Sequence, residues 1–406
     1  MINLYLKDCG VNFKDRTLLS KLKSLNFEVP SFASYTPDFE WIDSVAKKLK
    51  KYKRMIVIGR GGSITGFKAM YTALGVESSK DVYQIDTLDP DLLELVKENT
   101  SVKDTVVVVV SKSGNTVDAL ENMFFFEGYD VLAITENNNG ALKQIVDKRD
   151  LLWLEHPPIG GRFSSGTECA LGPLAFCYSD YKKVFTGMKS MFKKCDPSVG
   201  IKKNPALQLA AFFYLVERKG YSNVFMPIYS PFLSGFLELF MQLIHESSGK
   251  KGKGLVLFGA EAPESQHHTN QRLFGGKKNV CACFLREKSA HSGAKIKVPR
   301  DLRSVKIRNG TLGTSNGVSY SYGLQYEFIG TQKNATKLKI PNSVLTLDAR
   351  SPAAVGELIA LFEYATYYYC KLLGVDPFNQ PHVEGSKQIS FELRKKHSKL
   401  KRDKYC

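Results

Sequence analysis

The sequence has no apolar run long enough for a membrane-spanning helix. Its most apolar stretches, such as 105–110, are far shorter than the roughly 20 residues that cross a bilayer. The N-terminal residues 1–6 have neither the basic start nor the small-residue cleavage site of a secretory signal. We therefore expect a cytoplasmic protein without a membrane partner.

The eight cysteines lack the spacing of a disulfide framework or of a zinc site. They are scattered along the chain, and thiols inside a cell are normally reduced. Only Cys281 and Cys283 lie close together, and the single residue between them places both on one face of a strand, unlike the Cys-x-x-Cys pattern of metal sites. We predict that both are core residues and that the protein uses no metal and no dissociable cofactor.

Acidic residues are fewer than basic ones, 40 against 57, which leaves a formal charge of +17. Such a surplus attracts anionic substrates or nucleic acid, and it also increases solubility. Much of it lies in 394–404, where a helical pattern continues, and such a run is typical of a solvated helix face. No nucleic-acid-binding motif accompanies the charge, so we expect no nucleic-acid partner.

At 406 residues, the chain is longer than one hydrophobic core usually supports, which indicates two domains. From residue 55 onward, short apolar runs alternate with helical patterns. Nearly continuous apolar strands that alternate with helices predict a parallel sheet covered on both faces, with ligands at the carboxyl ends of its strands. The expected strands of this first doubly wound α/β domain are 55–59, 82–86, 105–111, 130–135 and 151–154.

A second α/β cycle begins near residue 200, with strands expected at 223–229, 254–258, 280–285 and 344–347. The predicted fold class is therefore α/β, with two doubly wound parallel-sheet domains. The segment 288–342 is basic and rich in glycine, serine and asparagine, so we expect strand fragments and loops there. The predicted division is an N-terminal extension (1–45), a first domain (46–195), a second domain (196–385) and a basic C-terminal helix or tail (386–406).

Two loops follow the first and third strands of the first domain, and each opens a helix: 59–63 and 111–116. Glycines let the backbone approach an anion, free amides at a helix N-terminus point at it, and hydroxyl groups add donors. One such loop alone is explained as well by helix capping, but two on one sheet indicate a phosphate site. Neither loop has the Walker or the dinucleotide pattern. The candidate phosphate-binding residues are Gly62, Ser63, Ser111, Lys112, Ser113 and Thr116.

Glu246 stands out because the spacing of Leu239 and Leu243 places it on the apolar stripe of a helix that Gly249 ends. Apolar surroundings and the negative end of the helix dipole both disfavour a charged carboxylate, which makes it a better base. The alternative is a structural ion pair between Glu246 and a nearby lysine or arginine.

Six segments occur in an order and approximate spacing that resemble the signatures of glucose-6-phosphate isomerases, most closely the short archaeal type. They are 59–63, 111–116, 160–164, 246–250, 266–267 and 380–387. The resemblance implies two sugar-isomerase (SIS) domains of flavodoxin-like topology. In that arrangement the first domain holds the phosphate and the catalytic groups converge between the two domains.

The resemblance also implies a reaction, the interconversion of glucose 6-phosphate and fructose 6-phosphate in glycolysis and gluconeogenesis through a cis-enediol. It gives Glu246 the proton transfer between C1 and C2, and Arg162 the stabilisation of the enediolate. It gives ring opening to His267, with Lys387 nearby, although the adjacent His268 leaves the identity of that histidine open. Gln380 keeps its place as a substrate-binding residue of the C-terminal signature.

Two departures from the family pattern keep alternatives open. Arg60 replaces a usually apolar residue of the glycine loop, and Gly385-Ser386 replaces the common pair before Lys387. Two other hypotheses for the function remain: a bifunctional phosphoglucose/phosphomannose isomerase, and a non-catalytic SIS regulator that binds sugar phosphates. The resemblance further implies a homodimer with shared active sites, in which the ring-opening histidine enters the site of the neighbouring subunit.

Overall fold

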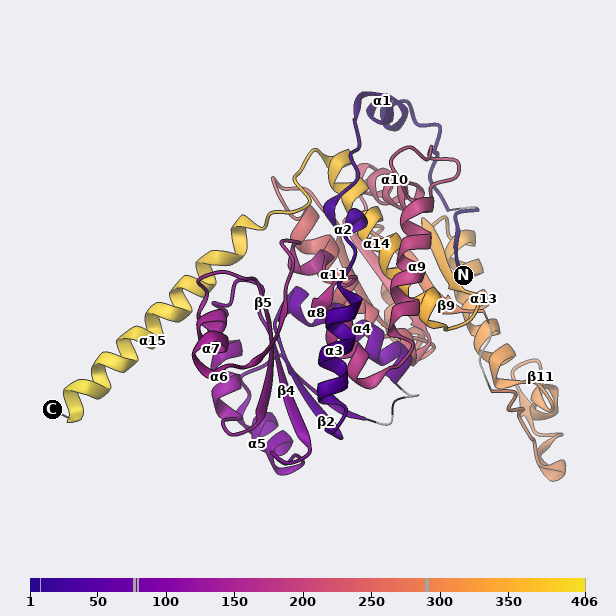
Figure 1. Cartoon of the computed structure of the whole chain (residues 1–406). Coiled ribbons are helices and arrows are strands. Elements are labelled where there is room, and N and C mark those ends of the chain that lie inside the picture. The colour runs from indigo at the N-terminus through magenta and orange to yellow at the C-terminus, as the bar shows by residue number, and fades with distance from the viewer. Residues whose placement is uncertain (8, 76–77, 79, 289–291, 406) are drawn as a thin grey trace.

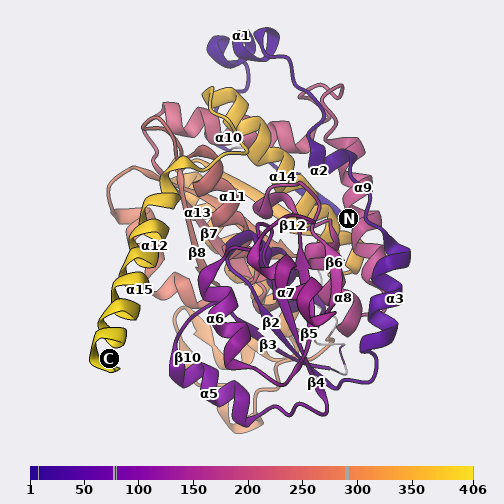
Figure 2. The same cartoon turned by 60° about the vertical axis from the view of Figure 1, so that its left-hand side comes forward.

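The computed structural model describes residues 1–405, except 8, 76–77, 79 and 289–291. Its core consists of two five-stranded sheets with helices packed on their faces (Figures 1 and 2). This architecture confirms the predicted α/β class. Among the described helices, none combines the length and the apolar character that a bilayer crossing requires.

The first sheet is wholly parallel and has the order β3-β2-β4-β5-β6. All of β4 is buried because helices cover both faces: α5, α6 and α7 pack on one, and α3, α4 and α8 pack on the other. All five strands predicted in this region are confirmed. They are β2 (Arg54–Ile58), β3 (Asp81–Ile85), β4 (Thr105–Val110), β5 (Asp130–Thr135) and β6 (Leu152–Glu155). The helices are α3 (Phe39–Leu49), α4 (Thr65–Leu74), α5 (Pro90–Glu98), α6 (Val117–Phe125), α7 (Ala141–Arg149) and α8 (Glu168–Cys177).

The second sheet has the order β1-β12-β9-β7-β8 and contains all four strands predicted for it. These are β7 (Asn223–Tyr229), β8 (Val256–Glu261), β9 (Val280–Glu287) and β12 (Asn342–Leu347). The strand β1 (Ile2–Tyr5) was not expected, because we assigned residues 1–45 to an extension. It pairs antiparallel with β12, so the start of the chain forms an edge of the second sheet.

One long helix, α14 (Pro352–Leu373), is buried along almost its whole length. Around it pack α9 (Tyr181–Lys194), α10 (Pro205–Arg218) and α11 (Phe236–Ser248). The α9 and α14 backbones meet at two glycines. A Cβ atom on Gly187 would lie 1.9 Å from the Ala353 carbonyl oxygen, and one on Gly356 would lie 1.9 Å from that of Val184. Only glycine permits this close helix crossing.

In the segment 288–342 the structure differs from the sequence prediction of strand fragments and loops. The short strands β10 (Lys306–Ile307) and β11 (Gly310–Thr311) match the expected fragments, but Tyr320–Lys337 forms the 18-residue helix α13. The helix begins at Ser319, whose hydroxyl oxygen accepts a hydrogen bond from the Tyr322 amide at 3.1 Å. Only three residues of this helix are buried: Phe328, Thr331 and Ala335. Its apolar stripe is therefore too weak for the helical period to be recognised in the sequence.

The C-terminal helix α15 (Glu384–Tyr405) extends away from both sheets in Figure 1. It is tied to α6 by an ion pair between Arg394 and Glu121, at 2.6 Å. Shorter helices complete the fold: α1 (Arg16–Ser24), α2 (Ser31–Ser34) and α12 (Thr269–Gly275).

The first prediction concerns the crossing of α9 and α14. Gly356→Ala is expected to lower the free energy of unfolding by at least about 2 kcal/mol, because its methyl group would force the two backbones apart. The matched control is Gly330→Ala on the exposed face of α13, where no atom lies within 4 Å of an added Cβ. That change should stabilise the protein by about 0.5–1 kcal/mol. Urea denaturation measures both, and equal stability of Gly356→Ala and wild type would contradict the proposed constraint.

The second prediction concerns His156, which directly follows β6 and is fully buried. Its Nδ1 lies 2.8 Å from the Pro157 carbonyl oxygen, while its Nε2 has no partner among the described residues. Burial lowers the pKa of His156 from 6.5 to about 4. Between these two values the unfolded chain binds a proton that the folded protein does not, so stability falls as the pH falls through this window.

The free energy of unfolding should therefore lose about 1.4 kcal/mol per pH unit through His156 between pH 6.5 and 4, and nothing above that range. His156→Gln removes the titrating group and should flatten the slope of stability against pH by that amount. Denaturation series at several pH values measure the slope, which is independent of any packing defect. Parallel slopes for variant and wild type would show that His156 is protonated in the folded protein.

Candidate active site

The two predicted phosphate loops lie at neighbouring positions on the carboxyl edge of the first sheet. One follows β2 and includes the short helical turn Gly61–Ser63, and the other follows β4 and leads into α6. The chain passes from β2 to β3 on one side and then to β4 on the other. Open parallel sheets bind ligands at such a switch point, where successive connections run in opposite directions.

The loop after β4 presents hydroxyl groups rather than a strong charge. Ser111 is buried, and its Oγ lies 2.8 Å from Thr116 Oγ1 at the start of α6. Ser113 is exposed and accepts a hydrogen bond from the Asn115 amide at 3.2 Å. The ammonium group of Lys112 pairs with Glu136 at 3.4 Å. The loop therefore offers short polar donors beside one neutralised lysine.

The loop after β2 is pressed against the segment that carries Arg162. A Cβ atom on Gly62 would lie 2.1 Å from the Gly161 carbonyl carbon and 2.3 Å from the Arg162 amide nitrogen. The carbonyl oxygen of Ser63 in turn lies 3.7 Å from the sulfur of Cys169. Any side chain at Gly62 would separate the loop after β2 from the segment that carries Arg162. This glycine therefore sets how closely Arg162 approaches the candidate phosphate site.

Arg162 is buried, with 3% of its side chain exposed, and all of its donors are occupied. Burial lowers the pKa of its guanidinium, and the neighbouring Glu246 carboxylate opposes that effect; an arginine nevertheless stays charged. The five acceptors are Ser247 Oγ at 2.8 Å, Glu246 Oε2 at 2.8 Å, Gln380 Oε1 at 2.9 Å, the Pro377 carbonyl at 2.8 Å and the Asn379 carbonyl at 3.0 Å.

Glu246 lies on α11 in the helical position that the sequence predicts, and the helix is capped at Gly249. The ion pair that we kept as the alternative is present, with Arg162 as the partner. Glu246 Oε1 also accepts a hydrogen bond from Gln242 Nε2 at 3.1 Å, and the hydroxyl of Thr65 donates to Gln242 Oε1 at 2.9 Å. The carboxylate is thus oriented from two sides while 30% of its side chain remains exposed.

Sequence reasoning missed Gln242 and Ser247, which contact the two charged groups directly. Gln242 lies one helical turn before Glu246, so the spacing of four residues was the available signal. Lys250 lies in the segment 246–250 of the family resemblance, which assigns it no role. It is buried, its ammonium group donates to the Asp376 carbonyl, and burial together with the nearby Arg162 charge lowers its pKa. The site therefore carries two buried cations around one carboxylate.

The structure brings together some of the predicted residues and not others. Gln380 lies against Arg162, as described above. His267 is exposed in a short turn (Glu264–His267) after β8, and the neighbouring His268 has its Nδ1 2.7 Å from Thr269 Oγ1. Lys387 is exposed on the first turn of α15 and pairs with Glu384 at 2.8 Å. In the described part of the chain, no contact joins His267 or Lys387 to Arg162 or Glu246.

The unusual Arg60 of the glycine loop is paired rather than free. Its guanidinium forms an ion pair with Asp118 on α6. It also donates two longer hydrogen bonds, to the carbonyl oxygens of Gly59 and Ile85. Arg60 therefore connects the loop after β2 to the helix after β4 and adds little net charge to the site. Among the described residues, no group of three histidine, cysteine or carboxylate side chains is arranged to hold a metal ion.

Comparisons with known proteins identify the family to which the chain is similar. The family model described as phosphoglucose isomerase matches residues 17–404. A relative from Methanococcus maripaludis, named as a probable glucose-6-phosphate isomerase, is 31% identical over 359 residues, which cover 84% of this chain and 79% of that protein.

Two solved structures share the fold. One is a hypothetical protein from Thermus thermophilus, with a TM-score of 0.82 and 21% identity over 97% of this chain and 99% of that one. The other is a glucose-6-phosphate isomerase from Chlamydia trachomatis, with a TM-score of 0.75 and 22% identity over 93% and 78% of the two chains. These similarities confirm the predicted two-sheet fold.

Proposed function

The chain belongs to the phosphoglucose isomerase family and is an isomerase, and we propose that the site around Arg162 and Glu246 interconverts glucose 6-phosphate and fructose 6-phosphate. The observation that carries this proposal is the Glu246 carboxylate. It is held by Arg162 and Gln242, remains partly exposed, and lies on a helix whose Gln242 side chain approaches Gly61 in the loop after β2. A protein that only binds sugar phosphates needs the loops but has no evident need for an oriented base.

The phosphate group would bind at the switch point of the first sheet. The hydroxyls of Ser111 and Thr116, only 2.8 Å apart, supply donors that bind equally well in the ground and transition states. Ser113, the Ser63 hydroxyl and the Gly62 amide would complete the cradle. Lys112 is already paired with Glu136, so it would attract the phosphate less strongly than an unpaired lysine would.

Proton transfer would fall to Glu246. The carboxylate would take the proton from C2 of the open-chain aldose, so that negative charge develops on O1 of a cis-enediolate. The protonated carboxyl group would then return this proton to C1, while the proton of the C2 hydroxyl passes to O1, so that C2 becomes the ketone carbonyl and C1 carries the hydroxyl. Arg162 would stabilise the oxygen on which negative charge develops, since its position is fixed before the reaction begins. Gln242 donates a hydrogen bond to Oε1 of Glu246 and Arg162 donates one to Oε2, so the two contacts together fix the orientation of the carboxylate.

Among the described residues, His267 and Lys387, to which the family resemblance assigns ring opening, do not contact Arg162 or Glu246 of their own chain. We propose a homodimer in which His267 of one subunit enters the site of the other, with Lys387 close by. The exposure of His267 on a turn at the edge of the second sheet supports this arrangement. A two-fold interface would make both sites equal without further contacts.

We also propose that the enzyme works in the cytoplasm. The seven cysteines that the structure describes are buried and no disulfide joins any two of them, and Cys281 and Cys283 are core residues as predicted. Such thiols suit a reducing compartment, where phosphorylated sugars are also found.

The test of the base is Glu246→Gln. The amide keeps the shape and still accepts a hydrogen bond from Arg162, but it cannot take a proton, so turnover should fall at least 1,000-fold, within the roughly 10²–10⁴-fold range of general base catalysis. Affinity for 6-phosphogluconate, a phosphorylated sugar acid, should change little. The control is Glu238→Gln on the exposed first turn of the same helix, which should keep wild-type turnover. A Glu246→Gln enzyme with a tenth of wild-type turnover would exclude Glu246 as the base.

The test of assembly mixes two inactive proteins, Glu246→Gln and His267→Ala, and lets their subunits exchange. If the histidine acts across the interface, each heterodimer has one intact site out of two, and random exchange should restore about a quarter of wild-type activity. Mass spectrometry of the mixture confirms the exchange, and a parallel mixture with His268→Ala shows which histidine acts. Full exchange without any recovery in either mixture would mean that ring opening is performed within one chain.

A further inference from the structure

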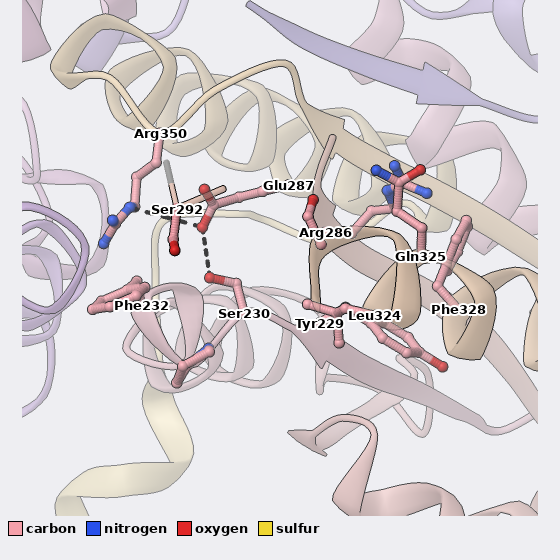
Figure 3. Close-up of a pocket in the computed structure, with 12 residues that line it drawn as sticks. Tyr229, Ser230, Phe232, Arg286, Glu287, Ser292, Leu324, Gln325, Phe328 and Arg350 are labelled. Atoms are coloured by element: carbon pink, nitrogen blue, oxygen red, sulfur yellow. Dashed lines mark hydrogen bonds and ion pairs between the residues drawn. The ribbon is translucent and has the colours of Figure 1, made fainter. Parts of the chain in front are cut away.

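The second sheet has its own cavity at the place that corresponds to the candidate phosphate site of the first sheet. The chain passes from β7 to β8 on one side and to β9 on the other, so β7 and β9 flank a switch point as β2 and β4 do. A cavity of about 340 Å³ opens at the carboxyl ends of β7 and β9 (Figure 3). The proposed isomerase chemistry makes no use of it.

The cavity walls are mostly apolar, with two arginines among them. Tyr229 and Phe232 come from the end of β7 and the turn that follows it, and Leu324 and Phe328 come from α13. At about 340 Å³ the cavity lies at the small end of the usual range for ligand pockets, and it exceeds what a bare inorganic ion fills.

One of the arginines is already neutralised. Glu287, the last residue of β9, accepts a hydrogen bond from Ser230 Oγ at 2.6 Å and lies 3.8 Å from Arg350 Nε. The guanidinium of Arg350 also lies 3.8 Å from the centre of the Phe232 ring and donates to the Ala73 carbonyl at 3.0 Å. In Figure 3 these residues form one end of the cavity.

Arg286, the other arginine, lies at the opposite end and lacks a counter-charge. Only 8% of it is exposed, and its guanidinium lies 4.5 Å from the centre of the Phe328 ring. Its Nε is buried without an acceptor, and among the described residues no carboxylate forms an ion pair with it. A buried cation without a partner is costly, and a single cation–π contact offsets only part of that cost.

We propose that this second-sheet cavity binds a small organic oxyanion, a phosphate monoester or a carboxylate, whose charged group pairs with Arg286 and whose body lies against Phe328 and Leu324. The recognition differs from that of the first sheet for a structural reason. β7 runs into Pro231, which has no amide hydrogen, so no glycine-rich amide cradle forms there and a guanidinium supplies the donors. The proposal does not depend on the isomerase activity.

The test measures binding by isothermal titration calorimetry on the full chain, in a Ser111→Ala/Thr116→Ala background that weakens the first-sheet site. The probes are phenyl phosphate, benzoate and inorganic phosphate. Arg286→Met should weaken binding of the organic probe at least tenfold, whereas Arg300→Met, which removes the same charge from an exposed turn, should not. Gln325→Glu keeps the shape of a residue that lines the cavity and places a negative charge there, so it should weaken binding as well, even if Arg286→Met folds poorly.

Saturable binding of either organic probe with this dependence on Arg286 and Gln325 supports the site, and the probe that binds identifies the oxyanion as an ester or a carboxylate. Absence of saturable binding by both organic probes overturns the proposal, as does binding that neither variant changes. Inorganic phosphate that binds as tightly as phenyl phosphate would also overturn it, because the apolar walls would then contribute nothing. Isomerase turnover of Arg286→Met should equal that of wild type, which separates this result from a failure of the proposed function.

Discussion

The guanidinium of Arg162 connects three parts of the chain that are far apart in the sequence. The loop after β6 supplies the arginine, α11 supplies Glu246 and Ser247, and the segment between α14 and α15 supplies Gln380 and two carbonyl groups. Because a buried charge that loses a partner costs several kcal/mol, these segments are held in one arrangement. These contacts hold the Glu246 carboxylate next to Arg162, so the same contacts that stabilise the junction between the sheets also orient the proposed base.

Two kinds of close approach make this junction possible. At Gly62 the loop after β2 touches the backbone at Gly161, and at Gly187 and Gly356 the helices α9 and α14 touch each other. A side chain at Gly62 would separate the loop after β2 from the segment of Arg162, and one at Gly187 or Gly356 would separate α9 from α14. The site therefore depends on glycines that themselves offer no chemical group, which is why mutations distant from the carboxylate are expected to affect it.

The two sheets share a switch-point topology, yet they present different chemical groups at their carboxyl edges. The first presents hydroxyls and backbone amides, and its Arg60 and Lys112 are paired with carboxylates. The second presents Arg286 against an aromatic ring, with Pro231 where an amide donor would be needed. In both proposals the common topology places the ligand at the carboxyl edge of the sheet, while the side chains at the ends of the strands select its chemistry.

The amino-acid sequence was sufficient to predict the strands of the first sheet and all but β1 of the second, the loops after β2 and β4, and the helical position of Glu246, because these depend on local periodicity and on residues close in the chain. It did not reveal α13, whose apolar stripe is too weak, or β1, whose pairing partner lies more than 300 residues away. The folded structure was needed to show that Glu246 pairs with Arg162, that Gln242 donates a hydrogen bond to Glu246, and that Arg60 pairs with Asp118. It was also needed to show that, among the described residues, His267 and Lys387 do not contact Arg162 or Glu246 of their own chain. Those contacts join elements with large sequence separations, and no periodicity within one segment encodes them.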